Sequence, residues 1–287
     1  MGYKVAIVGA GFGGLALAYF LSGKATVDVY DMKGIGGGAS GVASGLLHPY
    51  PGKKCVRSKR ADEALAAAME LVERVGAFKK GIVRKALDDE QRALFEERAK
   101  EQDDLTWSGE LHIHSGVTVF AKDYLEGLWK LCDATLHIKK VGLEDLRDYD
   151  RVIVAAGYGV REFFPDLNVR YNKGQILECK DAFKRSVIGD GYVAGKYIGS
   201  TYEHDFTSTE VDFEEAKRLI LPRAERYVDE PFEVVGAAAG VRVAKVGDYM
   251  PIAQQMDART FVLTAFGSRG LLYHALLAKE LVHQVLH

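Results

Sequence analysis

The sequence contains little cysteine and no long apolar run. Its three cysteines, Cys55, Cys132 and Cys179, are scattered over 287 residues without metal-ligand spacing, which argues against a disulfide framework and leads us to expect no metal site. No stretch of about 18 apolar residues indicates a membrane span. Because glycines interrupt the apolar N-terminal run, which also lacks a basic leader, we expect no signal peptide. These absences predict a cytoplasmic protein with reduced thiols and no membrane association.

An excess of charge of one sign is also lacking. The chain has 38 Lys and Arg against 40 Asp and Glu, a formal net charge of −2, which argues against a general polyanion binder. Positive charge is nevertheless concentrated in KKCVRSKR at 53–60 and in a second cluster at 79–85. The sequence shows neither an order of Ser, His and Asp nor a pair of carboxylates that would indicate a hydrolase. With 48% hydrophobic residues, the chain can bury a large core.

What the sequence does contain is a dinucleotide-binding fingerprint. Gly9, Gly11 and Gly14 form G-x-G-x-x-G between a strand-like and a helix-like apolar run, and Asp31 ends the next strand-like run. The first glycine permits a tight turn, the second lets the backbone approach a pyrophosphate, and the third lets helix and strand pack closely. Free N–H groups at the helix N-terminus attract the anion. Asp31 is placed to accept hydrogen bonds from an adenosine ribose, so the pattern predicts a dinucleotide without a 2′-phosphate.

Three further segments extend this prediction. The run RVIVAAG at 151–157 predicts a buried strand that ends in small residues, as expected where a parallel strand meets a cofactor. Residues 34–52 contain seven glycines, which bring the backbone close to something flat or anionic; a plain linker is the alternative. Residues 260–286 predict a strand, a glycine-rich turn and an apolar helix, so a second helix N-terminus points at the ligand.

The remaining pattern predicts an α/β fold with a discontinuous Rossmann-type domain. Helices are expected at 60–76, 88–103, 124–132 and 210–228, the last with a kink or break at Pro222. Strands are expected at 81–86, in ELHIHS and GVTVFA (110–121), and at 134–141. Residues 171–240 are β-rich with turn glycines, which predicts a mostly antiparallel sheet, with helices, inserted as a substrate domain. The expected domains are 1–52, 106–170 and 240–287 for the dinucleotide, and 53–105 and 171–239 for the substrate.

These motifs together carry a resemblance to a known family. GAGFGG followed by an acid, GGGASGVASG, VIVAAG, NKGQ at 172–175, GVR at 240–242 and FGSRGLLYHALLAKEL occur in this order. The chain thereby resembles FAD-dependent amine oxidoreductases of the D-amino-acid oxidase type. Within that superfamily it is most similar to the FAD domains of bifunctional enzymes that modify the tRNA wobble uridine, whereas glycine oxidases are more distant. The resemblance spans nearly the whole chain and is weakest across 76–135 and 205–235.

The resemblance implies FAD as the cofactor and assigns residues to it. The loop after the second strand lies along pyrophosphate and flavin in such enzymes, and the N–H groups after the GSRG turn lie near flavin O2 and N1, where negative charge collects on reduction. The adenine pairs with backbone at Lys140 or Val141. The implied cofactor-binding residues are Gly9, Gly11, Phe12, Gly14, Asp31, Gly38, Ala39, Ser40, Ala43, Ser44, Val141, Ala156, Gly157, Gly267, Ser268, Gly270, Leu271 and Leu272.

Arg242 and Arg269 match family positions that clamp the carboxylate of a glycine-like substrate. A planar guanidinium with paired donors suits this task, and a clamped carboxylate fixes the adjacent C–H against the flavin. The alternative for each arginine is a structural ion pair with a local acid such as Asp248 or Glu233. Tyr202, near His204, is a third candidate catalytic residue that lines the substrate space, with packing as its alternative.

The candidates for substrate or RNA contact lie around the basic run. His48 either shapes the flavin edge, forms a covalent flavin link, or is a packing histidine. Lys53, Lys54, Arg57 and Arg60 follow the flavin loop and can neutralise RNA phosphates, with a solvated surface as the alternative. Tyr50 can stack on an unstacked nucleobase.

Three functions follow and remain open at this point. The first is oxidation of carboxymethylaminomethyl to aminomethyl on a tRNA wobble uridine, with release of glyoxylate. A separate methyltransferase acts next in that pathway, because we expect no methyltransferase domain in this chain. The second is a small-molecule oxidase for glycine, sarcosine or a similar amine. The third is a flavin-binding partner protein without turnover.

Overall fold

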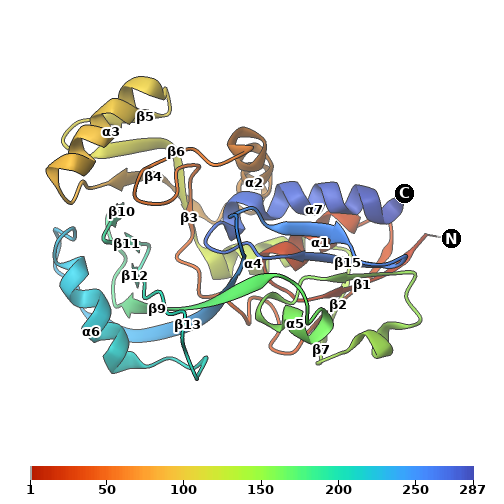
Figure 1. Ribbon diagram of the computed structural model, residues 1–287. Helices are drawn as coiled ribbons and strands as arrows, with labels where there is room; N and C mark the ends of the chain where they lie inside the picture. Colours follow the sequence, from red (N-terminus) through yellow and green to blue (C-terminus); the bar gives the residue numbers. More distant parts are fainter. Residues whose placement is uncertain (1) are drawn as a thin grey trace.

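The computed structural model describes residues 2–287, which form two β-sheets joined into one elongated molecule (Figure 1). The first sheet follows the order β14 (Ile252–Gln255), β15 (Thr260–Thr264), β8 (Arg151–Val154), β1 (Lys4–Val8), β2 (Thr26–Asp31) and β7 (Thr135–Ile138). All neighbours from β15 to β7 are parallel, and β14 adds an antiparallel edge. Segments from both ends of the chain thus lie side by side, as the Rossmann-type prediction requires.

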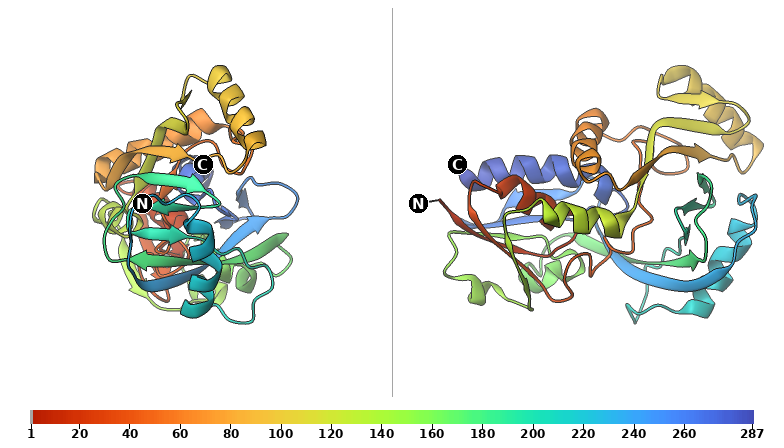
Figure 2. Two further views of the ribbon diagram at one scale, coloured as in Figure 1. Left: turned by 90° about the vertical axis from the view of Figure 1, so that its left-hand side faces the viewer. Right: turned by 180° about the vertical axis from the view of Figure 1, so that it is seen from behind.

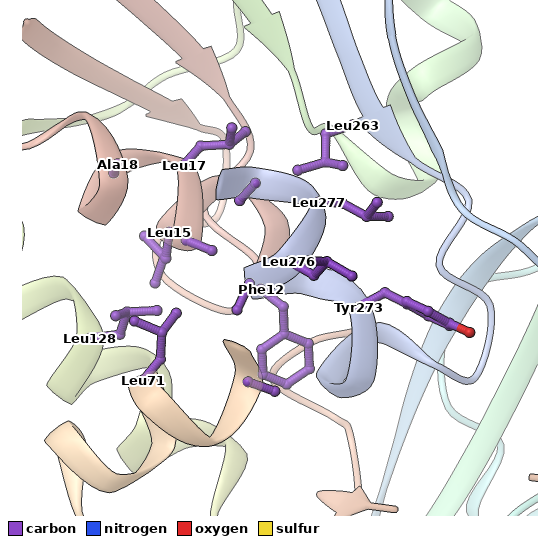
Figure 3. Close-up of a cluster of buried hydrophobic side chains, with 14 of the residues drawn as sticks. Phe12, Leu15, Leu17, Ala18, Leu71, Leu128, Leu263, Tyr273, Leu276 and Leu277 are labelled. Carbon is purple, nitrogen blue, oxygen red and sulfur yellow. The ribbon is translucent and has the colours of Figure 1, made fainter. Parts of the chain in front are cut away.

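Helices cover this parallel sheet and explain why its strands are apolar. Residues 5–8 of β1 are buried, because α1 (Phe12–Leu21) and α7 (Gly270–Leu286) pack on one face. Figure 3 shows Leu15 and Leu17 of α1 beside Leu276 and Leu277 of α7. The helices α2 (Ala61–Val75) and α4 (Ala121–Lys130) complete this layer. A second apolar cluster lies on the other face of the sheet, where the short helices η1 (Leu143–Leu146), η2 (Gly157–Gly159) and α5 (Val160–Phe163) are placed.

The second sheet has nine strands and is mostly antiparallel, as predicted; only its β10–β4 pair is parallel. α3 (Asp89–Glu101) and α6 (Phe213–Ala224) pack on it, and both lie at the end of the molecule away from the C-terminus (Figure 2). The strand order is β13 (Val234–Lys245), β9 (Val169–Cys179), β12 (Tyr197–Gly199), β11 (Gly191–Ala194), β10 (Ser186–Gly189), β4 (Phe78–Arg84), β6 (Leu111–Val119) and β3 (Leu46–Leu47), with β5 (Leu105–Trp107) paired to β6.

The elements differ from the sequence predictions in two places. The strand segments expected in ELHIHS and GVTVFA form the single strand β6, because Ser115 and Gly116 continue it. The helix expected at 210–228 is shorter and is not broken at Pro222, since α6 continues through it and ends at Ala224. The nine-stranded sheet also includes β3 and β6, which lie in the ranges 1–52 and 106–170 of the expected FAD domain. The domain ranges stay a prediction.

Within residues 2–287, no helix is long and apolar enough to cross a membrane. All three cysteines are free thiols. Burial raises the pKa of Cys132 to about 12 and that of Cys179 to about 11, so both are protonated at neutral pH.

Candidate active site

The glycines of the fingerprint make the close contacts that their sequence spacing predicts. Gly9 has a φ of +112°, and a Cβ on it would lie 2.3 Å from the carbonyl oxygen of Ala155. A Cβ on Gly14 would lie 1.8 Å from the carbonyl oxygen of Gly9. Asp31, at the end of β2, accepts the N–H of Ala10 at 2.9 Å and that of Lys33 at 2.8 Å. Each carboxylate oxygen has a second lone pair for a ribose hydroxyl.

The glycine-rich loop after β2 bridges the two sheets. Ser40 covers the N-terminus of α1, where its Oγ accepts the N–H of Phe12 at 3.1 Å. Next to it, the Cα of Ala39 would lie 3.0 Å from a Cβ on Gly240 of β13. A Cβ on Gly38 would contact nothing within 4 Å, so this part of the loop borders open space. The loop is therefore a packed support with an open side, which argues against a plain linker.

The C-terminal turn reaches the same strand from the other side. The N–H of Gly267 donates to the carbonyl of Val243 at 2.7 Å, and Phe266 forms a bridge with Ala244. The helix α7 begins at Gly270, and no side chain caps its N-terminus. The first N–H groups of a helix lack intrahelical acceptors, so those of Gly270 and Leu271 are available to a ligand.

A buried histidine holds this turn in place. The imidazole of His274 is fully buried, and its Nδ1 donates to the carbonyl of Leu271 at 2.9 Å. Nε2 therefore accepts from the hydroxyl of Tyr124 at 2.6 Å. Burial lowers the pKa of His274 to about 4. The ring also lies 5.7 Å from the ring of Phe12 in α1, so one neutral side chain connects both glycine-rich helix N-termini.

Between these two contacts, β9 and β13 present one continuous face, here called the Arg242 face. Its members are paired across the strands, Arg170 with Ala244, Asn172 with Arg242 and Gly174 with Gly240. Directly opposed residues of an antiparallel pair point to the same side. The glycine-rich loop touches this face at Gly240 and the C-terminal turn touches it at Ala244, a separation of about 13 Å along the strand. Arg242 lies midway between the two elements that we expect to hold the flavin.

Arg242 is supported by its own sheet and forms no ion pair within residues 2–287. Its guanidinium lies across Gly174, where a Cβ would be 2.7 Å from both terminal nitrogens. Nη2 donates to the Oγ of Ser200 at 3.1 Å. Among the described residues, no carboxylate forms an ion pair with Arg242. The expected competitors are engaged elsewhere, since Asp248 pairs with Lys245 at 3.1 Å and Glu233 with Lys180 at 3.1 Å.

Arg269 lies beside the Arg242 face but has different partners. It precedes α7, and its Nη1 donates to the carbonyl of Tyr249 at 3.4 Å. Its guanidinium carbon is 5.0 Å from the centre of the Tyr249 ring. The turn thus brings Arg269 close to β13 in space, while the guanidinium groups of Arg242 and Arg269 contact different residues. A joint carboxylate clamp stays a prediction.

Tyr202 belongs to the same side of the sheet. Lys173 is bridged to Glu203, and these two side chains share the opposite face with Gln175, so alternation places Tyr202 on the side of Arg242. Its side chain is 54% exposed and packs edge-on against His204 at 5.1 Å. Tyr202 is therefore free to contact a ligand. Tyr273, by contrast, is buried and donates to the carbonyl of Lys59, which makes it a packing residue.

A pocket surrounds the segment expected to bind adenine. It measures about 410 Å³ and lies between the segment 140–145 and the short helix α5. Val141 is buried in its wall, and the N–H of Lys139 donates to the carbonyl of Asp31 at 3.1 Å. This contact connects the pocket to the proposed ribose site. A larger hollow, about 740 Å³, lies between α2 and the C-terminal half of α7, and none of the predicted cofactor residues line it.

Tyr50 is part of a buried support next to the half-buried His48, which corrects one prediction. Tyr50 is fully buried, so it cannot stack on a nucleobase. Arg84, 5% exposed, donates to the carbonyls of Tyr50 and Gly52 at 2.9 and 2.7 Å, so it fixes this loop and is not free for phosphate. His48 accepts the N–H of Tyr50 through Nδ1 at 3.2 Å. Burial, together with the charge of Arg84, lowers the pKa of His48 to about 3, so its ring is neutral.

The basic run is only partly available to an anion. Lys53 and Lys54 are exposed. Arg57 is paired with Asp62 and donates to the Tyr50 hydroxyl at 2.6 Å. Arg60 is paired with Glu63 at 2.8 Å and with Glu280. The two arginines of the run are thus engaged with acids of this chain. No group of three or more metal-ligating side chains converges within residues 2–287.

Sequence reasoning missed three residues of this site. His274 carries no signal because an isolated histidine on an apolar helix is ordinarily a packing residue. Asn172 is part of the NKGQ motif, yet only strand pairing shows that it lies opposite Arg242, with its Oδ1 buried and without a partner. Tyr249 lies in the irregular loop after β13. Only the folded structure shows that it is close to Arg269.

The site is composed as an FAD site requires, with a glycine turn, an acid at the end of β2, an uncapped second helix and a face without bulky side chains at Gly174 and Gly240.

A family model described as FAD dependent oxidoreductase (DAO) matches residues 4–284. The tRNA 5-methylaminomethyl-2-thiouridine biosynthesis bifunctional protein MnmC of Maricaulis maris is 28% identical over 98% of this chain and 52% of its own length. The chain thus spans about half the length of this curated relative.

Two solved structures share the fold over nearly the whole chain. Glycine oxidase from Geobacillus kaustophilus is 21% identical, with a TM-score of 0.77 over 98% of this chain and 95% of its own. Iminodiacetate oxidase from Chelativorans sp. BNC1 is 20% identical, with a TM-score of 0.76 over 98% and 94%. Together with the family match, which covers almost every residue, the geometry makes this chain a member of the DAO family of FAD-dependent oxidoreductases.

Proposed function

We propose that this chain oxidises the C–N bond of an N-substituted glycine, and that its substrate is the carboxymethylaminomethyl group of a tRNA wobble uridine. The observation that carries the proposal is the position of Arg242. It lies half-buried on the Arg242 face between the glycine-rich loop and the C-terminal turn, without an acidic partner among the described residues. A guanidinium held in this way lacks only an anion, and the carboxylate of a glycine unit fits it.

The chain's own residues bind and orient the substrate. Arg242 holds the carboxylate, and Ser200 and Gly174 fix the position of its guanidinium. The adjacent methylene then points at the space between the loop and the turn, where FAD supplies the acceptor for a hydride. The N–H groups of Gly270 and Leu271 at the uncapped N-terminus of α7 stabilise negative charge in that space.

The proposed reaction is a two-electron oxidation of the substrate to an imine, followed by hydrolysis. The substrate methylene loses a hydride and its nitrogen loses a proton, so that the C–N single bond becomes an imine. Water adds to the imine carbon and the C–N bond breaks, which releases glyoxylate and leaves the aminomethyl group on the uridine. Arg242 holds the carboxylate throughout, and a tyrosine on the same side, Tyr202, is free to contact the reacting end of the substrate.

The tRNA substrate is supported by the names of the relatives and by the exposed lysines. The curated relative from Maricaulis maris is named as a tRNA biosynthesis protein, and Lys53 and Lys54 are exposed next to the flavin loop. In this proposal, a separate methyltransferase uses the aminomethyl product. A free small amine is the second candidate, because the ion pairs of Arg57 and Arg60 reduce the positive charge of the 53–60 run.

Anaerobic reduction of the purified protein separates the candidates. We expect bound FAD to be bleached by tRNA isolated from cells that carry the carboxymethylaminomethyl group, with glyoxylate formed in equal amount. Bleaching by sarcosine or glycine alone would support a small-molecule oxidase. Flavin that none of these substrates reduces would support a binding protein without turnover.

A further inference from the structure

An exposed aromatic ring lies close to two guanidinium groups at the Arg170 end of the Arg242 face. Tyr249, in the loop between β13 and β14, is 61% exposed. The guanidinium carbon of Arg269 is 5.0 Å from the centre of its ring and that of Arg170 is 5.9 Å. The three residues come from a loop, a turn and a strand, so only the folded chain brings them together.

Strand pairing connects this cluster to the proposed reaction site. Arg170 is opposite Ala244, one pair further along the Arg242 face than Asn172 and Arg242. Ala244 is bridged to Phe266, at the start of the turn that carries Arg269. A substrate whose carboxylate is held by Arg242 and which extends along this face toward Ala244 therefore meets Arg170 and Tyr249 next.

The charges of the cluster are not compensated by the part of the chain that the structure describes. Neither Arg170 nor Arg269 forms an ion pair with a carboxylate among the described residues, and the Nε of Arg170 is buried without a partner. The neighbouring acid, Asp248, is occupied by Lys245 and by the N–H of Met250. Two uncompensated guanidinium groups beside one ring favour an anion that also has a flat surface.

We propose that Tyr249, Arg170 and Arg269 form a subsite for a nucleotide of single-stranded RNA, whose base stacks on Tyr249 and whose phosphate contacts Arg170. Stacking on an exposed aromatic ring with guanidinium groups at hand is typical of single-strand binding, and an unstacked loop nucleotide offers both partners. The inference rests on the proposed tRNA substrate and deepens it. It moves the RNA contact from the ion-paired arginines at 57 and 60 to Arg170 on the Arg242 face and Arg269 beside it.

Fluorescence anisotropy with a labelled RNA hairpin that carries an anticodon loop tests this subsite in the FAD-loaded protein. Tyr249→Ala should weaken binding about tenfold, whereas Tyr249→Phe should retain most of it because stacking needs only the ring. Arg170→Gln should reduce the slope of log affinity against log salt by about 0.7. The matched controls are Tyr158→Ala, an exposed tyrosine on η2, and Arg218→Gln, an ion-paired arginine on α6.

The outcomes distinguish this inference from the proposed function. If the wild type binds the hairpin and oxidises tRNA while Tyr249→Ala and Arg170→Gln bind it equally well, the subsite is overturned and the function stands. If the wild type binds no RNA at any salt concentration, both are overturned. Uridine monophosphate is the control for a free nucleotide, and competition at concentrations near those of the hairpin would contradict an RNA subsite. Unchanged flavin absorbance and melting temperature show that each variant is folded.

Discussion

Two groups of arginines in this chain have opposite environments. Arg57 and Arg60 lie close together in the sequence, and each pairs with acids that belong to the chain itself. Arg170, Arg242 and Arg269 are far apart in the sequence, meet on or beside one face of the β9–β13 pair, and have no acidic partner among the described residues. Clustering along the sequence therefore did not identify which arginines lack an acidic partner. The fold determines which guanidinium groups still lack an anion.

The largest effect is expected at Arg242. Arg242→Ala should lower the second-order rate of flavin reduction by about 100-fold or more, because it removes a charged group that binds the substrate's carboxylate. Arg242→Lys should restore only part of this rate, since an ammonium cannot reproduce the two parallel donors. Stopped-flow reduction under anaerobic conditions measures both. Arg57→Gln is the matched control, and equal losses in Arg57→Gln and Arg242→Ala would remove the distinction between the two groups.

The second prediction concerns two histidines that the fold keeps neutral. Burial lowers the pKa of His48 to about 3 and that of His274 to about 4, from an ordinary value of 6.5. The unfolded chain binds these protons more readily, so stability is unaffected above pH 6.5 and falls as the pH drops from there toward 4. For the fully buried His274 the loss is about 1.4 kcal/mol per pH unit.

Urea unfolding across this pH range measures the slope, and His274→Gln should reduce it by about half relative to the wild type. A slope that His274→Gln leaves unchanged would show that other groups cause the acid sensitivity. The same variant should also weaken FAD binding, because His274 connects the N-termini of α1 and α7.

A smaller effect is expected at Arg269. Its guanidinium is engaged with Tyr249, so it contributes less to the carboxylate than Arg242 does. Arg269→Gln should lower the rate of flavin reduction by about tenfold, the equivalent of about 1.4 kcal/mol. A loss as large as that of Arg242→Ala would show that the two guanidinium groups act together as the sequence predicted.

The smallest effect is expected at Arg60. Exposed ion pairs contribute at most about 1 kcal/mol, so Arg60→Gln should lower the free energy of unfolding slightly and leave flavin reduction unchanged. Urea denaturation and stopped-flow kinetics on the same preparation check both statements. A strong loss of tRNA turnover with normal stability would show that Arg60 contacts the tRNA substrate.

The fold was largely predictable because its main signals are local. G-x-G-x-x-G, the acid at 31 and the strand, turn and helix at 260–286 each fix a short segment, and their order implies one parallel sheet. The break that was one alternative at Pro222 did not occur, since packing of α6 on the sheet overrode the local proline signal.

The site was predictable only where a motif marks it. Arg242 and Arg269 lie in GVR and GSRG, but their separate partners, Ser200 and Tyr249, depend on strand pairing and on a loop conformation. Tyr50 was wrongly expected on the surface because the basic run at 53–60 follows it closely. Its burial depends on Arg84, more than 30 residues away, which binds the carbonyls of its loop.

The central claim is that Arg242 holds a carboxylate against bound FAD, and a spectral titration tests it most directly. Oxidised protein is titrated with acetate and glycolate, which offer a carboxylate but no amine to oxidise. The account predicts a saturable change in the visible flavin spectrum of the wild type that Arg242→Ala abolishes and Arg57→Gln preserves. A protein that carries no flavin, or a spectral change of equal affinity in wild type and Arg242→Ala, would contradict it.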